Sequence, residues 1–415
     1  MNFKPCALVA AALLGYAHAA LGADGEVAVR VDLNPAHSVF NRPRVTVSVC
    51  LQQPGPDGKG CIEVPDVLVD TGSTGLLLRR SALTGLAGLK PAGEYDHAFR
   101  HRYVYAPAFG ALTQAWIGLG TLYTPAPIGI GLFGADDEPA SPGSSSGGGG
   151  EVEGLAMLLQ PFNGVLGIAP QPSSCSACPD CACPPAAEVA QYFRRMPAGG
   201  GDAWQPSPVP SGYELSNPVA ALPADFNDGF VLRIELPDSA ALQAGVASGT
   251  LFLGVERWRD PLFGQEAPRI PLHNPSWWFA ASSSEPGQPP TLLVLPDSGS
   301  ATVLAPERYK ASPEDANPAP LRQLPLFFGI PGAAPGEAYG PFRVDIAEVD
   351  CPASEGRPLH TLATRFHDGE HLMALGMPFF YGRTIAFRLP EEPGAVSGRD
   401  PDGGYLMIAP APQGA

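Results

Sequence analysis

Two aspartates in this sequence stand in the same local pattern. Asp70 follows an apolar run and begins Asp-Thr-Gly-Ser, while Asp297 follows an apolar run and begins Asp-Ser-Gly-Ser. Residues 67–76 and 293–302 therefore form a weak internal repeat. We expect each aspartate to lie at the end of a strand, in a tight turn that projects its carboxylate into a cleft.

The other residues of the two motifs predict how the turns are held. The glycine permits backbone angles that other residues resist and lets a neighbouring backbone come close. The hydroxyl residue after each aspartate can donate to the facing turn, and the next serine can bond its own aspartate. The expected supporting residues are Thr71, Gly72, Ser73, Ser298, Gly299 and Ser300.

Paired carboxylates of this kind suit general acid–base hydrolysis. Two such groups a few ångströms apart cannot both ionise easily, so one pKa rises and the pair shares a proton. One carboxylate can then activate a water while the other protonates or polarises a carbonyl. The chemistry expected of Asp70 and Asp297 is peptide hydrolysis without a covalent intermediate and without a metal or other cofactor.

The repetition makes this pattern specific. A single Asp-Thr-Gly-Ser is more often an ordinary turn, because all of its residues favour turns. Each copy is followed by an apolar-apolar-Gly element, at residues 165–167 and 374–376. A long repeat that occurs twice indicates two related lobes rather than a solenoid.

The composition predicts a mostly β protein. The 415 residues include 49 Gly and 49 Pro, which favours short strands joined by turns over long helices. Strands are predicted from apolar or alternating runs at residues 64–69, 230–236, 251–255, 291–295 and 384–389. Helices are predicted at residues 187–196, 218–222 and 306–310.

From these motifs, the chain resembles the pepsin family of aspartic peptidases over roughly residues 31–410. VLVDTGSTG and VLPDSGSAT resemble the two active-site motifs of that family, and they occur in the family's order. Further similar segments are FNGVLGIAP (162–170), SGTLFLGVE (248–256), MALGMPFFYGRTIAF (373–387) and YLMIAPAP (405–412). The chain looks closest to a secreted bacterial branch of aspartyl-protease-like proteins.

The resemblance implies a bilobal, pepsin-like double β-barrel with a cleft between two related lobes. The N-terminal lobe would span residues 26–222 and the C-terminal lobe 223–415. Within the first lobe, residues 139–150 are expected to form a flexible loop, and residues 171–213 a Cys/Pro/Gly-rich excursion. Asp70 and Asp297 would be catalytic, Thr71 and Ser298 would brace the two turns, and Ser73 and Ser300 would support the aspartates.

Two features depart from the family pattern. Pro296 directly precedes Asp297, and because proline removes a backbone donor, we expect it to displace the second turn. The family closes its cleft with a hairpin flap that carries a tyrosine next to a glycine. Tyr105 or Tyr103 could serve as that residue, or either could be an ordinary hairpin aromatic.

The N-terminus predicts export. Lys4 precedes an apolar stretch that ends in an Ala-x-Ala cleavage pattern, so residues 1–22 are interpreted as a signal peptide. The protein would then lie in the periplasm or outside the cell, without a membrane anchor and as a monomer. The net charge of −16 and the absence of a basic stripe argue against a nucleic-acid partner.

The cysteines are consistent with an oxidising compartment. Cys50 and Cys61 bracket a short Gly- and Pro-containing loop, so a local disulfide is expected. The CxxCxxCxC cluster could bind zinc, but disulfides are the better interpretation after a signal peptide. The pairing stays open for Cys175, Cys178, Cys181, Cys183 and Cys351.

Three functions remain open from the sequence. The favoured one is an exported aspartic endopeptidase with a polypeptide substrate across the cleft. The alternative is a catalytically inactive pepsin-fold module that binds or inhibits a protein ligand, because fold does not determine function. A metal-dependent module is the least favoured. Asp96, His97 and His101 would form a metal site only on a helix, and their flanks indicate a loop that enters a hairpin.

Overall fold

The computed structural model is mostly β, as the sequence predicts. It describes residues 24–34, 37, 39–55, 58–90, 94–103, 107–134, 162–174, 190–196, 204–264, 267–272, 279–282, 292–306, 322–328, 339–346, 365–367, 371–391 and 403–410. The predicted signal peptide, the loop at 139–150 and the cysteine cluster lie outside these residues. So do Cys351 and Tyr105.

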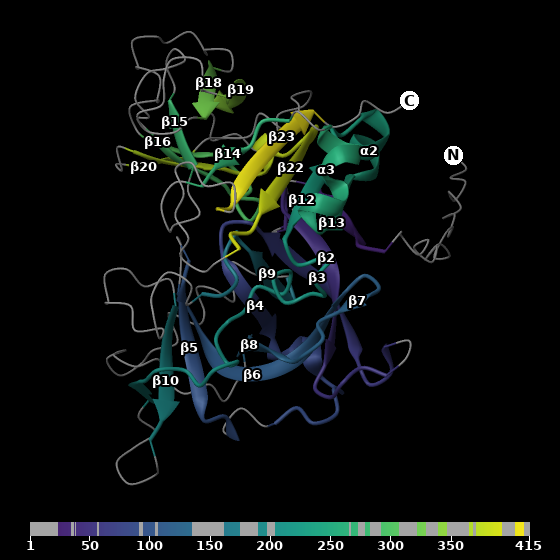
Figure 1. Ribbon diagram of the computed structural model, residues 1–415, viewed down its shortest axis with the longest axis vertical. Helices are drawn as coiled ribbons and strands as arrows, with labels where there is room; N and C mark the ends of the chain where they lie inside the picture. The colour runs from purple at the N-terminus through teal and green to yellow at the C-terminus, as the bar shows by residue number, and fades with distance from the viewer. Residues whose placement is uncertain are drawn as a thin grey trace, which may run out of the picture.

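Six strands close into a barrel in the order β2-β3-β9-β4-β8-β6, with β6 pairing back to β2. Alternating valines explain its inward face: Val45, Val47 and Val49 of β2 are all buried. The barrel occupies the lower half of Figure 1. Its strands are β2 (Pro43–Cys50), β3 (Ile62–Asp70), β4 (Thr74–Arg79), β6 (Pro107–Leu119), β8 (Ile128–Phe133) and β9 (Gly164–Ile168).

A long hairpin extends from the barrel. The N-terminal half of β6 leaves the barrel and pairs antiparallel with β5, and β5 pairs in turn with β10. Ala98, Phe109, Phe193 and Trp204 form a small core in this extension. Its strands are β5 (His97–Arg102), β10 (Ala190–Arg195) and β11 (Trp204–Pro206). At the other end of β6, β7 (Leu122–Tyr123) pairs with Gly118 and Leu119.

The barrel sheet continues through β1 into a second group of strands. The order runs β2-β1-β13-β12-β22-β23-β14. In β12, Phe230, Leu232 and Ile234 are buried as the alternation predicts, but the strand ends at Ile234 and Leu236 is exposed. These strands are β1 (Glu26–Asp32), β12 (Gly229–Ile234), β13 (Val246–Leu253), β14 (Ile270–Pro271), β22 (Arg383–Arg388) and β23 (Tyr405–Pro410).

A separate seven-stranded sheet lies at the upper left of Figure 1. Phe279, Val294 and Met373 of this sheet belong to the same apolar cluster as Val69 and Leu166 of the barrel, so one continuous core joins the two sheets. Its strands are β15 (Phe279–Ser282), β16 (Leu292–Pro296), β17 (Leu304–Pro306), β18 (Arg322–Phe328), β19 (Tyr339–Ile346), β20 (Arg365–His367) and β21 (Leu372–Leu375).

The internal repeat of the sequence is also a repeat of strand pairing. Around the first motif, β3 is antiparallel to β2 and parallel to β9, and β4 is antiparallel to β9 and parallel to β8. Around the second, β16 is antiparallel to β15 and parallel to β21, and β17 is antiparallel to β21 and parallel to β20. Each aspartate motif therefore connects two strands that are separated in the sheet by one other strand, β9 in the first case and β21 in the second.

Helices are short and few among the described residues. Asp238 caps α2 (Ser239–Ala244), and the Asp228 carboxylate accepts bonds from the first two N–H groups of α3 (Val255–Phe263). The 3₁₀ turns are η2 (Arg80–Leu83) and η8 (Met377–Phe379). None of these helices has the length and apolar character needed to traverse a bilayer.

Two predicted helices are wrong. Residues 190–195, within the segment 187–196, form strand β10, because Tyr192 and Phe193 are both buried when β10 pairs with β5. Residues 218–222 form turns. Of the predicted helix at 306–310, the structure describes only Pro306, which ends strand β17. Tertiary contacts overrode weak local propensity in these segments.

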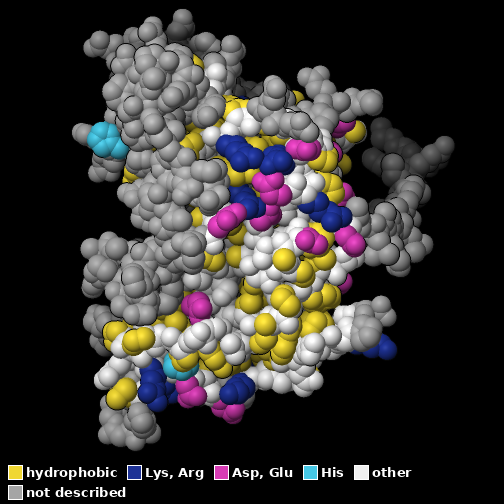
Figure 2. Space-filling model, viewed as in Figure 1, with side chains coloured by type: hydrophobic (Ala, Val, Ile, Leu, Met, Phe, Trp, Pro, Cys, Tyr) yellow, Lys and Arg dark blue, Asp and Glu magenta, His cyan; other side chains and the backbone are white. Residues whose placement is uncertain are grey.

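The predicted disulfide joins Cys50 and Cys61 and closes the connection between β2 and β3. On the surface, charged side chains occur in small groups of mixed sign. Figure 2 shows such groups at the upper middle, the region of α3 and β22. There Arg259 pairs with Glu256 and Arg388 with Asp228.

Candidate functional site

The two sequence motifs place their aspartates at equivalent points of the fold. Strand β3 ends at Asp70, opposite Gly167 of β9. Strand β16 ends at Pro296, and the next N–H, that of Asp297, donates to the Leu375 carbonyl of β21 at 3.0 Å. Each aspartate is therefore located where a strand leaves its parallel neighbour and enters a tight turn.

The first turn holds both oxygens of Asp70. The Gly72 N–H donates to Oδ1 at 2.8 Å, and the Ser73 hydroxyl donates to Oδ2 at 2.6 Å. Asp70 is 6% exposed and Ser73 is buried. The carboxyl group has one defined orientation, because each oxygen has its own donor from the same turn.

The second turn repeats this arrangement atom for atom. The Gly299 N–H donates to Asp297 Oδ1 at 2.9 Å, and the Ser300 hydroxyl donates to Oδ2 at 2.6 Å. Asp297 is half-buried, whereas Asp70 is buried. The two carboxyl groups thus accept hydrogen bonds from equivalent donors, each in its own turn, but differ in their exposure to water.

Thr71 and Ser298 hold the two turns together. The Thr71 hydroxyl donates to the Pro296 carbonyl at 2.7 Å and accepts from the Ser298 N–H at 2.9 Å. The Ser298 hydroxyl donates to the Val69 carbonyl at 2.7 Å and accepts from the Thr71 N–H at 3.2 Å. Both side chains are fully buried. These four reciprocal bonds fix the separation of the two carboxyl groups.

The motif glycines allow each turn to approach the opposite carboxyl group. A Cβ atom added to Gly72 would lie 2.6 Å from Asp297 Oδ1, and one added to Gly299 would lie 2.6 Å from Asp70 Oδ1. The Asp297 carboxyl also hydrogen-bonds to that of Asp70. The structure therefore brings together the two aspartates that the sequence singles out.

This contact changes the proton affinity of the pair. Burial, and then the negative charge of Asp297, raise the pKa of Asp70 to about 8, although the bonds from Ser73 and Gly72 act in the opposite direction. One proton therefore stays on the pair through neutral pH. The other carboxyl group is then free to act as a base.

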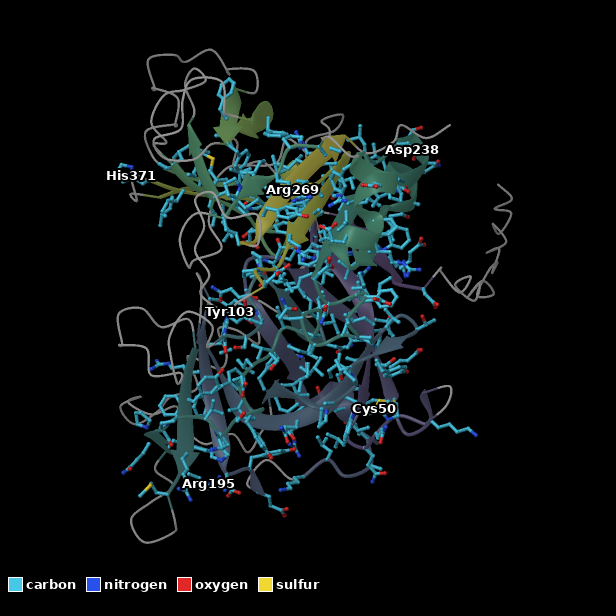
Figure 3. The ribbon with its side chains drawn as sticks, viewed as in Figure 1. Cys50, Tyr103, Arg195, Asp238, Arg269 and His371 are labelled. Carbon is cyan, nitrogen blue, oxygen red and sulfur yellow. A yellow bond between two sulfur atoms is a disulfide. The ribbon has the colours of Figure 1, made fainter. Side chains whose placement is uncertain are left out.

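Tyr103 lies beside the pair, at the end of β5. It begins the connection between β5 and β6, and Figure 3 shows it near the middle of the molecule. Its hydroxyl hydrogen-bonds to Ser73, and burial together with the charge of Asp70 raises its pKa well above the usual range. The hydrogen bond with Ser73 acts on this pKa in the opposite direction.

His101 packs against Tyr103, and the sequence did not single it out for this role. Their ring centroids are 4.5 Å apart. His101 is 1% exposed, its Nδ1 has no hydrogen-bond partner among the residues that the structure describes, and burial lowers its pKa to about 4. The segment 97–102 is strand β5 rather than a helix, and His97 instead packs on Tyr213 at 5.9 Å. Among the described residues, no three metal-ligating side chains gather.

The expected displacement of the second turn by Pro296 is wrong. The Pro296 carbonyl accepts the Thr71 hydroxyl, and the bonds of Asp297 match those of Asp70. Successive N–H groups of a strand point to opposite sides. Since the Asp297 N–H points to β21, an N–H at position 296 would point away from β21. Among the described residues, the pairing with β15 on that side covers Leu292 to Val294, so the proline lies past its end.

Comparison with known sequences places this site in a family. No curated protein matches the chain. A family model described as "Protein of unknown function (DUF3443)" matches residues 23–405, which include both aspartate motifs, Tyr103 and the Cys50–Cys61 disulfide. Because this match covers most of the chain, the protein belongs to the DUF3443 family.

Proposed function

We propose that this protein is an exported aspartic endopeptidase that hydrolyses peptide bonds with Asp70, Asp297 and an activated water. The observation that carries the proposal is the reciprocal bonding of the two turns. Four buried hydrogen bonds between Thr71, Ser298 and the opposite backbones hold two carboxyl groups in contact. A purely structural role would not require two acidic side chains to face each other in the interior, because burying two groups of like charge together costs free energy.

The chemistry follows from one proton shared by two carboxyl groups. The ionised carboxylate removes a proton from a water molecule as its oxygen attacks the scissile carbonyl carbon. The protonated carboxyl donates its proton to the carbonyl oxygen, which gives a neutral tetrahedral diol. The diol then collapses as the carboxyl groups return one proton to the leaving amine and accept one from a hydroxyl. Fixed orientation of both acids lowers the entropic part of this barrier.

We further propose that the two aspartate motifs belong to related lobes, as in the pepsin family. Two groups of strands support this division, because they have the same pattern of pairing within each group. The first group is β2, β3, β4, β8 and β9, and the second is β15, β16, β17, β20 and β21. The lobes would span residues 26–222 and 223–415. An extended polypeptide would bind in the cleft between them, across the aspartate pair.

Tyr103 is the residue that we assign to the flap. The antiparallel pairing of β5 with β6 forms a hairpin, and Tyr103 lies directly after its first strand. Its bond to Ser73 brings the hairpin to the aspartate pair. In this position, the hairpin would cover a bound polypeptide and limit access of bulk water to the reaction.

Export is supported by two features of different kind. Residues 1–22 have the pattern of a signal peptide. The Cys50–Cys61 disulfide is typical of proteins in oxidising compartments. We therefore propose that the protein acts in the periplasm or outside the cell.

A binding module that does not turn over is the second candidate. The observation that favours it is the depth of Asp70, which is 6% exposed and whose two oxygens already accept bonds within the first turn. Such a carboxyl group has little access to a catalytic water. In this case the cleft would hold a protein ligand intact.

Cleavage of denatured casein from about pH 3 to about pH 9 distinguishes the two candidates. The wild type is compared with Asp70→Asn and Asp297→Asn, each checked for folding by circular dichroism. Cleavage that disappears in both variants supports the peptidase. Folded wild type that leaves casein and several other unfolded substrates intact supports the binding module.

A further inference from the structure

Asn41 is a fully buried polar residue far from both motifs in the sequence. It precedes β2, is 0% exposed, and has a φ of 55°, in the left-handed region. Its N–H donates to the Asp32 carbonyl at the end of β1, at 2.7 Å. Asparagine tolerates this backbone conformation better than most residues. The side chain is thereby directed into the interior.

Both polar ends of the Asn41 carboxamide have distant partners. Its Nδ2 donates to the Ala301 carbonyl at 2.5 Å, and its Oδ1 accepts the Tyr381 hydroxyl at 2.6 Å. These partners lie 260 and 340 residues away along the chain. Asn41 therefore joins the start of the barrel sheet to the turn that follows Asp297 and to the segment before β22.

The bond to Ala301 acts on the residue next to Ser300. Ser300 donates its hydroxyl to Asp297, and its own carbonyl accepts from the Met377 N–H at 2.8 Å. Met377 begins η8, which leads directly to Tyr381. The contacts thus form a closed ring: the segment of residues 377–381 holds Ser300 directly and holds Ala301 through Asn41.

The opposite side of this turn leaves no room for adjustment. A Cβ atom added to Gly376 would lie 2.2 Å from the Thr302 carbonyl oxygen and 2.7 Å from that of Ser300. The turn is therefore packed against Gly376 and bonded to Asn41. We expect loss of the Asn41 bond to let the turn move away from Gly376, and Asp297, which accepts the Ser300 hydroxyl, to move with it.

An asparagine is needed because the site requires a donor and an acceptor on one planar group. An aspartate would place a negative charge beside the buried Asp32, and would have no donor for Ala301. Burial, and then the charge of Asp32, raise the pKa of Tyr381 above its usual range, so its hydroxyl remains a donor. The Asn41 carboxamide therefore has one orientation, with Nδ2 toward the Ala301 carbonyl and Oδ1 toward the Tyr381 hydroxyl.

We propose that Asn41, oriented by Tyr381, is a positioning residue that fixes Asp297 against Asp70. The proposal rests on the proposed function, but its structural part does not depend on catalysis. Asn41 acts through the Ala301 backbone and contacts neither aspartate side chain. Its effect would be on the geometry of the pair, and so on the proton that the two carboxyl groups share.

The test compares Tyr381→Phe and Asn41→Gly with the matched control Tyr405→Phe. Phenylalanine at 381 removes one hydroxyl, and glycine at 41 keeps the left-handed backbone while it removes the carboxamide. Tyr405 is equally buried and donates to Glu256, on the side of the molecule that carries α3. Each protein is assayed for casein cleavage and labelled with ¹³C at the aspartate carboxyl carbons, with the signal of Asp70 assigned from Asp70→Asn.

We expect both test variants to lower kcat about tenfold to hundredfold with KM little changed, because misplacement by about 1 Å has effects of this size. The upper titration step of the pair should fall by about half a pH unit or more, since Asp297 repels the Asp70 charge less when it moves away. Tyr405→Phe should change neither quantity. A wild type that cleaves nothing, with a titration step that still falls in Tyr381→Phe, would reject the peptidase and keep the positioning role. An unchanged step in both folded test variants would reject the positioning role.

Discussion

Thr71 and Ser298, which lie 227 residues apart, each donate a hydrogen bond to the backbone of the other's strand and each accept one from the other's N–H. The arrangement is symmetric, and both side chains are completely buried. No polar atom of either hydroxyl is left without a partner. This relationship ties the two halves of the site into one unit.

Removing either hydroxyl should destabilise the whole chain. Thr71→Val keeps the shape of the side chain but leaves the Pro296 carbonyl and the Ser298 N–H unpaired, which costs about 1–3 kcal/mol of unfolding free energy. Ser298→Ala should cost a similar amount. Urea denaturation of both variants and of the double variant should show a coupling of at least about 0.5 kcal/mol. Thr84→Val, at an exposed position, is the control, and equal stability of all four variants would contradict the prediction.

Gly72→Ala should displace the opposite carboxyl group. The new methyl group would lie 2.6 Å from Asp297 Oδ1, so the two turns must separate. We expect a loss of about 1–3 kcal/mol in stability and about a hundredfold loss in casein cleavage. Gly55→Ala is the matched control, since its Cβ would lie 3.4 Å from the Lys59 Cβ, near ordinary contact distance. An active and stable Gly72→Ala protein would show that the turns are not held as closely as the structure indicates.

The shared proton predicts a fall in both activity and stability at alkaline pH. The folded-state pKa of Asp70 is about 8, above the unfolded value near 3.8, so the folded protein binds more protons between these values. The stability that this proton provides is complete below about pH 4 and is lost as the pH rises through about 8. Casein cleavage should decline over the same alkaline range, because the pair then loses its acid.

Asp70→Asn isolates this contribution. The variant should lose the part of the pH dependence that lies between about pH 4 and about pH 8, and its stability relative to wild type should increase steadily as the pH rises. Guanidinium denaturation at several pH values across this range measures the difference. A constant difference between the two proteins at all pH values would mean that Asp70 titrates normally.

His101 predicts a change of the opposite sign at acid pH. Its folded-state pKa is about 4, below the unfolded value near 6.5, so the unfolded chain binds more protons between these values. Stability should therefore fall by about 3 kcal/mol as the pH decreases from about 6.5 to about 4. His101→Gln should remove this decrease, and His371→Gln, at an exposed position, should retain it. Identical acid profiles for wild type and His101→Gln would contradict the assignment.

The sequence alone was sufficient for the features that are local. The two Asp-x-Gly-Ser turns, the apolar strands before them and the glycine elements after them depend on residues close together in the chain, whose backbone preferences and alternation are visible in one dimension. The mostly β class and the Cys50–Cys61 disulfide follow from the same kind of information, since turn-rich composition and a short loop between cysteines are both local properties. Repetition then indicated that the two motifs belong together.

The tertiary structure alone determined what depends on contacts between distant segments. The different burial of Asp70 and Asp297, the burial of His101, and the brace from Asn41 to Ala301 and Tyr381 all depend on contacts between segments far apart in the chain. Contacts between distant segments also account for β10, where pairing with β5 overrode a helical pattern. They account for Pro296 as well, because an N–H at that position would face away from β21 and lie past the end of the pairing with β15. Local propensity contributes fractions of a kcal/mol per residue, whereas burial and buried hydrogen bonds contribute about 1–3 kcal/mol each, so long-range contacts decide these points.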